Sequence, residues 1–176
     1  MVRNGFTLVE LMVTLVVLGI LVSIALPSFS GLIKNERLTT QANDLLSDLA
    51  FARTEAMRRG GRVTVCPSAD QASCGTDWAA GRLIFADLDR DTEVTAGDEI
   101  LRSRIALSGE NSLVYSSALA QRIQFRGSGL PNDQLISGTT LKESFKLCDA
   151  SAANLGRLIT ITTLGTVEIS RSVSCP

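Results

Sequence analysis

Histidine is missing from this sequence of 176 residues, and its absence removes several kinds of chemistry. Without an imidazole the chain cannot build a Ser/His/Asp or Cys/His catalytic site, and a typical zinc site is disfavoured. No pair of carboxylates accompanies a substrate-binding motif of the kind that a hydrolase needs. The net charge of −1 gives no overall attraction to nucleic acid or acidic lipid. We therefore expect neither enzymatic activity nor a bound cofactor.

Internal repeats and low-complexity tracts are also absent, and the chain is too short for two ordinary domains. Its composition, 45% hydrophobic and 20% charged, is that of a folded protein rather than a disordered one. We expect one domain with a core of its own.

Four cysteines are present, none of them in a CxxC arrangement: Cys66, Cys74, Cys148 and Cys175. In an exported protein an even number of cysteines favours two disulfides, for which there are three connectivities. Because short loops close most readily, we expect Cys66–Cys74, which leaves Cys148–Cys175 to tie the C-terminal end to the body. The alternative is four buried thiols in a cytosolic protein. The N-terminal segment favours the exported form.

The N-terminal segment from Phe6 to Leu26 is apolar with few interruptions. The interruptions are Thr7, Glu10, Thr14, Gly19 and Ser23. About 20 helical residues cross the hydrocarbon core of a bilayer, so we expect residues 6–26 to span a membrane once. In a secretory signal peptide the small polar residues would follow the apolar run, but here Arg3-Asn4-Gly5 precedes it. The charges flanking the span do not orient it, whereas disulfides would place the rest of the chain in an oxidising compartment.

The stretch GFTLVEL, which begins at Gly5, resembles the prepilin signal of type IV pilins and type II secretion pseudopilins. In that signal a glycine is followed by Phe-Thr-Leu, a hydrophobic residue and Glu. The resemblance implies that a prepilin peptidase removes residues 1–5 as a leader, cutting after Gly5, and that Phe6 becomes the methylated first residue. It also implies an inner-membrane protein with a periplasmic head.

Glu10 places a carboxylate inside the apolar segment, where isolation costs about 2.5–3.5 kcal/mol. The resemblance supplies a reason for it. After cleavage a cationic amine would lie at Phe6, one helical turn from Glu10, and in a fibre the acid of one subunit can neutralise the amine of a neighbour. The alternative is an acid near the edge of the span whose carboxylate reaches water. We expect Glu10 to act in assembly.

A long stem helix is predicted to continue beyond the membrane segment and to end at Gly60-Gly61. Pro27 removes an amide that would bond the Ser23 carbonyl, so a kink or local melting is expected there. Residues 27–60 form the amphipathic half of this stem. Its apolar stripe is Leu38, Ala42, Leu45, Leu46, Leu49, Ala52 and Ala56. Its opposite, polar side is predicted to carry Asn43, Asp44, Ser47, Asp48 and Thr54.

From residue 61 to residue 176 the pattern changes to short β-prone runs separated by Gly, Pro, Asn, Asp or Ser. The runs are RVTVCP, RLIFADLD, ILRSRIAL, SLVYSS, RIQFRG, SFKLCD and RLITITTLGTVEIS. We expect an all-β head of two antiparallel sheets packed on the stem helix. The fold class is therefore predicted to be α+β and type IV pilin-like, with half of the long stem helix in the membrane.

The head narrows the resemblance. The stretch CPSADQASCGTDWAAGRLIFADLDRD looks like the FimU/FimT/GspH group of minor pilins and pseudopilins. The C-terminal pattern of Cys148, Gly156-Arg157, a last pair of strands and Cys175 points to the same group. Major pilins of this superfamily usually carry one C-terminal disulfide loop and a different head. The resemblance therefore implies a minor subunit.

The acidic stretch DLDRDTEVTAGDE contains a weak candidate for a calcium site. Asp87, Asp89 and Asp91 alternate as ligands do at the start of a calcium loop. An EF-hand loop has Gly at its sixth position and Glu at its twelfth, where this chain has Thr92 and Asp98. A solvated hairpin between two strands is the favoured interpretation.

Basic residues gather near the end of the stem helix. They are Arg53, Arg58, Arg59 and Arg62. Cations suit a helix C-terminus, and Glu55 is spaced to pair with Arg59. The alternative is a patch that contacts DNA phosphates. By resemblance, FimT-type receptors carry a Gly-Arg-x-Arg motif in the C-terminal strands, but this chain has Gly165-Thr166-Val167-Glu168 there, which disfavours DNA binding.

The resemblance implies a minor pilin of the type IV pilus that primes or supports pilus assembly near the tip. Its expected partners are the prepilin peptidase, other major and minor pilins, and the assembly platform of the inner membrane. Two alternatives stay open: a DNA-binding competence pilin, and a GspH-type pseudopilin of type II secretion. The pair of expected disulfides favours the pilus.

Overall fold

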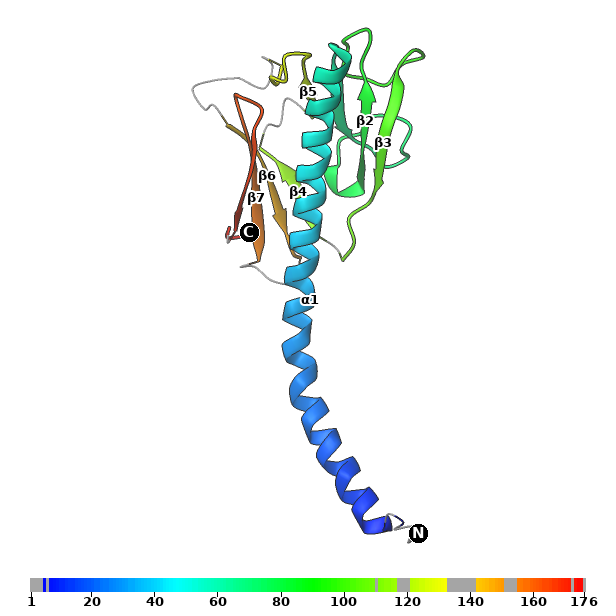
Figure 1. Ribbon diagram of the computed structural model, residues 1–176, viewed down its shortest axis with the longest axis vertical. Coiled ribbons are helices and arrows are strands. Elements are labelled where there is room, and N and C mark those ends of the chain that lie inside the picture. The colour runs from blue at the N-terminus through cyan, green and yellow to red at the C-terminus, as the bar shows by residue number, and fades with distance from the viewer. Residues whose placement is uncertain are drawn as a thin grey trace. The chain divides into compact units, whose positions relative to one another are not determined.

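The computed structural model describes residues 5, 7–109, 111–116, 121–132, 142–150, 155–171 and 173–175, with side chains for all of these except 24–28, 142 and 171. The chain divides into two compact units, Met1–Arg37 and Leu38–Pro176. The long helix α1 (Leu8–Arg59) begins in the first unit and ends in the second, and all the strands belong to the second unit (Figure 1).

Both ends of α1 are closed by the hydrogen bonds that its sequence offers. At the start, the Thr7 hydroxyl accepts a hydrogen bond from the Glu10 amide at 3.2 Å, as an N-cap residue does. At the end, Gly60 adopts a φ of 62°, and the Gly61 amide donates to the Ala56 carbonyl at 3.2 Å. A left-handed glycine after the last helical residue is a common helix stop. The predicted end at Gly60-Gly61 is therefore confirmed.

The helix continues through Pro27 without a break, so the local melting considered for that position is not found. A kink at Pro27 falls within residues 24–28, whose side chains lie outside the described part of the chain. The kink stays a prediction.

The second unit contains two four-stranded antiparallel sheets, as expected for the head. The first sheet has the order β3-β2-β1-β5 and is made of β1 (Val63–Pro67), β2 (Gly81–Ala86), β3 (Glu99–Ile105) and β5 (Ile123–Phe125). The second has the order β4-β6-β7-β8 and is made of β4 (Ser112–Tyr115), β6 (Lys142–Cys148), β7 (Gly156–Thr162) and β8 (Val167–Arg171). Each predicted β-prone run contributes to one of these strands, and the last run forms both β7 and β8.

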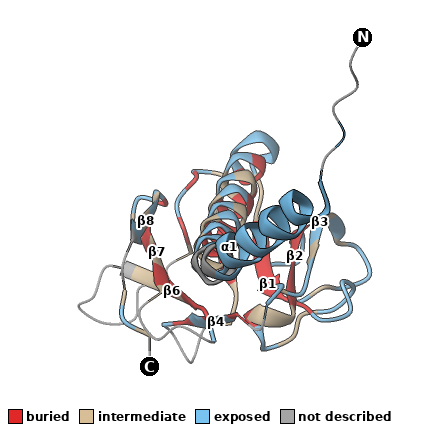
Figure 2. Cartoon of the chain, turned by 90° about the horizontal axis from the view of Figure 1, so that it is seen from below, coloured by how far each residue is buried: buried red, intermediate tan, exposed pale blue. Residues whose placement is uncertain are grey.

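The core of the second unit lies where the apolar stripe of α1 meets both sheets (Figure 2). The stripe residues with at most 1% of their surface exposed are Leu38, Ala42, Leu45, Leu49, Ala52 and Ala56. They pack with side chains such as Ile84 and Phe125 from the first sheet and Phe145 and Ile159 from the second. Leu46, which the helical spacing predicts for this stripe, is only partly buried. The α+β, pilin-like fold is confirmed.

One residue of the helix was assigned to the wrong side. Asp48 was predicted to face solvent, but its side chain is fully buried against the first sheet. The prediction was wrong because a carboxylate can be buried when cations from other elements pair with it, and those cations come from strands far away in sequence.

Candidate functional site

The helical part of the first unit presents an unusual surface. Between Leu8 and Val22 every large apolar side chain is at least 45% exposed. A helix that is hydrophobic all round is normally covered, either by protein or by lipid. Within the described residues, however, we find no helix whose length and apolarity would let it cross a membrane. The apolar surface of residues 8–22 is thus the feature of this unit that needs a covering partner.

Glu10 lies on this surface, in the first turn of α1, and is exposed. Among the described residues, no ion pair involves Glu10, so its carboxylate is not neutralised within the described chain. An acid in the first helical turn is favoured by the helix dipole. Gly5, the predicted cleavage residue, is exposed, whereas Phe6 and residues 1–4 lie outside the described residues.

The four cysteines form two disulfides in the second unit. Cys66 bonds to Cys74 with a Cα–Cα distance of 5.6 Å, and Cys148 bonds to Cys175 with a distance of 5.9 Å. The first is the pair expected from its short loop and the second is the pair left over, and both distances lie in the usual range for a disulfide. The first bridge packs on Leu83 and Phe85 of the first sheet. The second joins the end of β6 to residue 175, beyond the last strand.

Asp48 is the centre of a buried ion cluster. Arg82 of β2 donates to one carboxylate oxygen from Nε at 2.8 Å, and its Nη2 lies 2.6 Å from the same oxygen. Arg102 of β3 donates to the other oxygen at 2.9 Å, and Arg104 approaches with Nε at 3.2 Å. Burial by itself raises the pKa of Asp48, but the charge of Arg82 and the hydrogen bonds from all three arginines outweigh it and lower that pKa.

Polarity patterns along the chain do not indicate this cluster, although the sequence carries one signal for it. Residues two apart in a strand point to the same face, so Arg102 and Arg104 share a side of β3. Arg82 occupies an inward position of a strand that is buried along its whole length. A buried arginine needs a buried acid, and the polar side of α1 supplies one. The guanidinium of Arg102 also covers the ring of Phe51, 4.0 Å from its centroid.

The basic residues at the end of α1 form ion pairs with neighbouring acids. Arg59 donates to Glu55 and to Glu99 at 2.6 Å each, which confirms the predicted Glu55–Arg59 pair. Arg58, whose side chain is 66% exposed, donates to Glu55 as well. Hydrogen bonds from Arg58 and Arg59 lower the pKa of Glu55 to about 2. The charges of these two arginines are therefore partly neutralised.

The two other arginines proposed for DNA contact are also engaged. Nη1 of Arg53 donates to the Gly165 carbonyl at 2.9 Å, in the turn between β7 and β8. Nη1 of Arg62 donates to the Gln124 side chain at 2.7 Å. All four arginines therefore have partners within the fold. This agrees with the interpretation of the basic residues as part of the helix end and its ion pairs, rather than as a patch for DNA.

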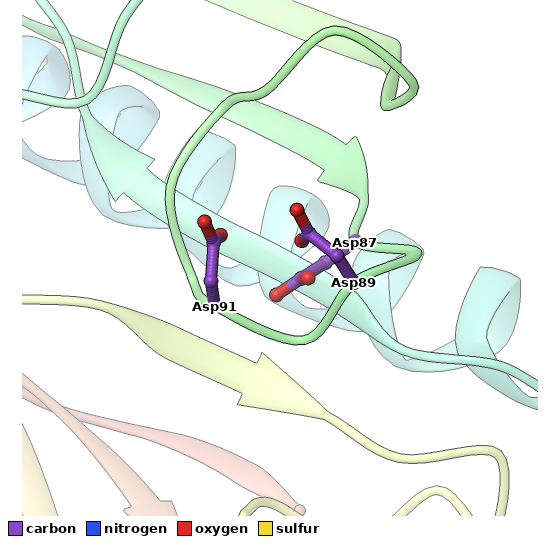
Figure 3. Close-up of side chains that lie close together, drawn as sticks. All are labelled: Asp87, Asp89 and Asp91. Atoms are coloured by element: carbon purple, nitrogen blue, oxygen red, sulfur yellow. The ribbon is translucent and has the colours of Figure 1, made fainter.

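The acidic stretch forms the connection between β2 and β3, as the hairpin interpretation expects. Figure 3 shows Asp87, Asp89 and Asp91 on this loop, and their carboxylates have oxygens within 4.8 Å of one another. Asp87 is buried and accepts hydrogen bonds from the backbone amides of Arg90 and Thr92.

Further hydrogen bonds tie the buried acid of this loop to the first sheet. The other partners of Asp87 are the side chains of Thr64 and Gln124. Thr92, at the place where a calcium loop has Gly, adopts a φ of 68°. These contacts explain Asp87 as a residue that holds the loop in shape. The geometry of the loop does not by itself identify a bound ion.

Two segments of the chain match known protein families. Residues 41–165 match the family described as Type II transport protein GspH. This chain belongs to the GspH family. Residues 1–26 of this family member also match the prokaryotic N-terminal methylation motif. The resemblance to minor pilins and pseudopilins, inferred from the sequence, is confirmed.

Two curated proteins are similar to this GspH-family chain over part of their length. The type IV major fimbrial protein FimA of Dichelobacter nodosus is 30% identical over 94 residues, which cover 53% of this chain and 54% of FimA. The pilin-like protein PilA1 of Thermus thermophilus is 34% identical over 99 residues, 56% of this chain and 58% of PilA1. The chain thus spans little more than half the length of the curated relatives that it matches.

Solved structures agree with the fold over more of the chain. A crystal structure of the type IV minor pilin FimU of Pseudomonas aeruginosa matches with a TM-score of 0.63 at 20% identity, covering 81% of this chain and 98% of FimU. The minor pseudopilin EpsH from the type 2 secretion system of Vibrio cholerae matches with a TM-score of 0.53 at 11% identity, covering 77% and 97%. At these identities the likeness establishes the fold alone.

Proposed function

We propose that this chain is a minor pilin that enters a type IV pilus near its tip and helps to prime pilus assembly. The observation that carries the proposal is the apolar surface of residues 8–22, which follows the prepilin-type signal and contains Glu10. Packing this surface between neighbouring subunits would bury it. Before assembly, residues 6–26 would hold the chain in the inner membrane with the second unit in the periplasm.

The chemistry proposed for the N-terminus follows from its residues. A prepilin peptidase removes residues 1–5 and leaves a methylated, cationic amine on Phe6. In the fibre, Glu10 of one subunit neutralises the Phe6 amine of the next, because an unpaired charge in a stack of apolar helices is costly. The partners are other major and minor pilins, added through the inner-membrane assembly platform.

Intact mass measurement of the membrane-extracted protein tests the processing step. The expected mass corresponds to a chain that begins at Phe6 and carries a methyl group. Retention of residues 1–5 in a cell with an active peptidase would refute this part of the proposal.

A set of substitutions at Glu10 tests the assembly step. Glu10→Ala removes a charge from an apolar segment and should not reduce insertion. Glu10→Gln keeps the size of the side chain but not its charge, so both variants should be depleted from sheared pili, whereas Glu10→Asp should be partly retained. Membrane-fraction blots provide the control for normal levels. If the Ala and Gln variants join pili as well as wild type does, Glu10 is an edge residue that reaches water.

The second candidate function is that of a minor pseudopilin in type II secretion, and the match to the GspH family favours it. The names of the two curated relatives favour the pilus. A deletion strain separates the candidates when surface pili with twitching motility, secreted enzymes and DNA uptake are scored side by side. Loss of pili alone supports the pilus subunit, and loss of secretion alone supports the pseudopilin. Loss of DNA uptake alone would point to the competence alternative.

A further inference from the structure

A cleft with a volume of about 220 Å³ opens beside the ion cluster of Asp48 in the second unit. Arg82 of β2 and Arg104 of β3 line it, together with Asp44 of α1. Ile105, the last residue of β3, and Ala106, which follows it, form an apolar part of its wall, and Ile105 is 74% exposed. The cleft therefore combines cationic side chains with an exposed apolar edge.

The charges around this cleft do not balance. Three cations, Arg82, Arg102 and Arg104, surround Asp48. Among the residues that the structure describes, the one additional acid of the cluster is Asp44, whose carboxylate lies 4.0 Å from Arg104 and is 47% exposed. Three positive charges and two negative charges leave a net charge of +1. One further carboxylate would make the cluster neutral.

The two arginines that line the cleft also have donors left over. A guanidinium has five N–H groups. Arg82 uses Nε and Nη2 on Asp48, and Arg104 uses the same two nitrogens. Within the described part of the chain, Nη1 of neither residue has a hydrogen-bond acceptor. Asp48 holds both guanidinium groups in place. Arg104, whose side chain is 39% exposed, would offer an incoming carboxylate donors that are already oriented, whereas Arg82, 3% exposed, contributes its charge from beneath.

We propose that this cleft receives the side-chain carboxylate of an Asp or Glu on a neighbouring pilin-like subunit. The proposal rests on the proposed function, because it needs a subunit packed alongside. Charge complementarity selects an acid, and the apolar edge at Ile105 favours a protein surface over a free anion, since contact with a protein would also bury that side chain. Arginines held in a partly buried site are frequent contributors to binding between proteins.

A photo-crosslinking amino acid, p-benzoyl-phenylalanine, introduced at Ile105 of the full chain in cells tests this proposal. Crosslinks should map to another pilin-like subunit, beside an Asp or Glu. Arg104→Gln should lower the crosslink yield about tenfold, whereas Arg104→Lys, which keeps the charge, should retain most of it. Val114, which is 60% exposed on β4 of the other sheet, is the matched position for the crosslinker, and its yield should not respond to Arg104→Gln.

A second variant keeps the test decisive if Arg104→Gln disturbs the fold. Ala106→Glu removes no contact of the cluster but places a carboxylate at the cleft from within the chain, so it should also suppress the Ile105 crosslink. Exchange of charge provides the positive control. Arg104→Glu should abolish the crosslink, and an Arg in place of the mapped partner acid should restore it.

The results that would overturn the proposal differ from those that would overturn the proposed function. Unchanged yields of the Ile105 crosslink in Arg104→Gln and in Ala106→Glu would show that the cleft does not bind a carboxylate. Crosslinks to segments without an acid would show the same. Crosslinks to pilin-like subunits from Leu15 of the apolar helix but none from Ile105 would mean that the cleft stays empty in the fibre. If Leu15 also gives no such crosslink, the protein is not a fibre subunit and both proposals fall.

Discussion

Replacing Asp48 by Asn should destabilise the second unit severely. The side chain of Asp48 is fully buried and that of its partner Arg82 is 3% exposed, so neither charge can turn to water. Breaking a buried ion pair by removing one partner typically costs about 3–5 kcal/mol, because the other charge is left buried without compensation. Domains of this size are stable by about 5–15 kcal/mol, so Asp48→Asn should remove a large part of the free energy of unfolding.

The matched control lies one helical turn away. Asp44 also carries a carboxylate toward Arg104, but it is 47% exposed and 4.0 Å distant. Exposed pairs contribute about 0–1 kcal/mol, so Asp44→Asn should change the free energy of unfolding little. The two substitutions are chemically identical, and their difference isolates the effect of burial.

Urea unfolding of the full chain in detergent, with the disulfides intact, measures both variants. Trp78 is the one tryptophan of the sequence, is 2% exposed, and packs edge-on against Phe145 at 4.8 Å, so its fluorescence reports the core of the second unit. The midpoint should fall steeply for Asp48→Asn and hardly at all for Asp44→Asn. A loss below about 1 kcal/mol for Asp48→Asn, the value for an exposed pair, would refute the account of the cluster.

The pH dependence provides an independent check with a defined sign. The pKa of Asp48 is lowered on folding, so its carboxylate contributes stability that is fully present above the unfolded pKa of about 3.9. That contribution is lost as the pH falls through the lower pKa of the folded protein. The gap in stability between wild type and Asp48→Asn should be constant near neutral pH and shrink below about pH 4.

Two further predictions concern the disulfides and a tight turn. Replacing both cysteines of the Cys148–Cys175 bridge by Ser should cost about 3.5 kcal/mol, and opening the shorter bridge on β1 about 2.5 kcal/mol, because the loops differ in sequence separation, 27 against 8 residues. Non-reducing peptide mapping should first find both bridges, and free thiols or crossed pairs in periplasmic material would contradict the pairing. Gly165→Ala should destabilise by about 1–2 kcal/mol or more, since Gly165 has a φ of 73° and an added Cβ would lie 2.6 Å from the Gly129 carbonyl oxygen. Gly97→Ala, with open space around it, should be nearly neutral when both variants are unfolded in urea as above, and equal losses for both glycines would refute this reasoning.

Much of this fold could be predicted because it depends on short-range patterns. The helix is long and strongly periodic, Gly60 stops it, and the β-prone runs are separated by turn residues. Such short-range patterns could not predict the order of the strands within the sheets. Strand β1 pairs with β5 across a long stretch of intervening chain, and no local signal indicates that partnership.

The ion cluster shows where polarity patterns fail. A helical pattern assigns Asp48 to the polar side, since it weighs each residue by its own affinity for water. The position is decided instead by Arg82, Arg102 and Arg104, which reach it from 34, 54 and 56 residues away in sequence. Asp48 could be assigned correctly only by asking which acid those strand arginines require. The same limit applies to the cleft, because its charge imbalance exists only after the strands have been placed beside the helix.

The order of the strands has a consequence for how the chain can fold as it is synthesised. The chain completes three strands of the first sheet, then lays β4 into the second, then returns to the first with β5 before the second is finished. Neither sheet is therefore encoded by an uninterrupted segment: when β5 completes the first sheet, β4 has already emerged without the three strands that complete its own. The apolar stripe of α1 must wait for partners from nearly the whole chain, and the bond between Cys148 and Cys175 can form only after the last strand has emerged.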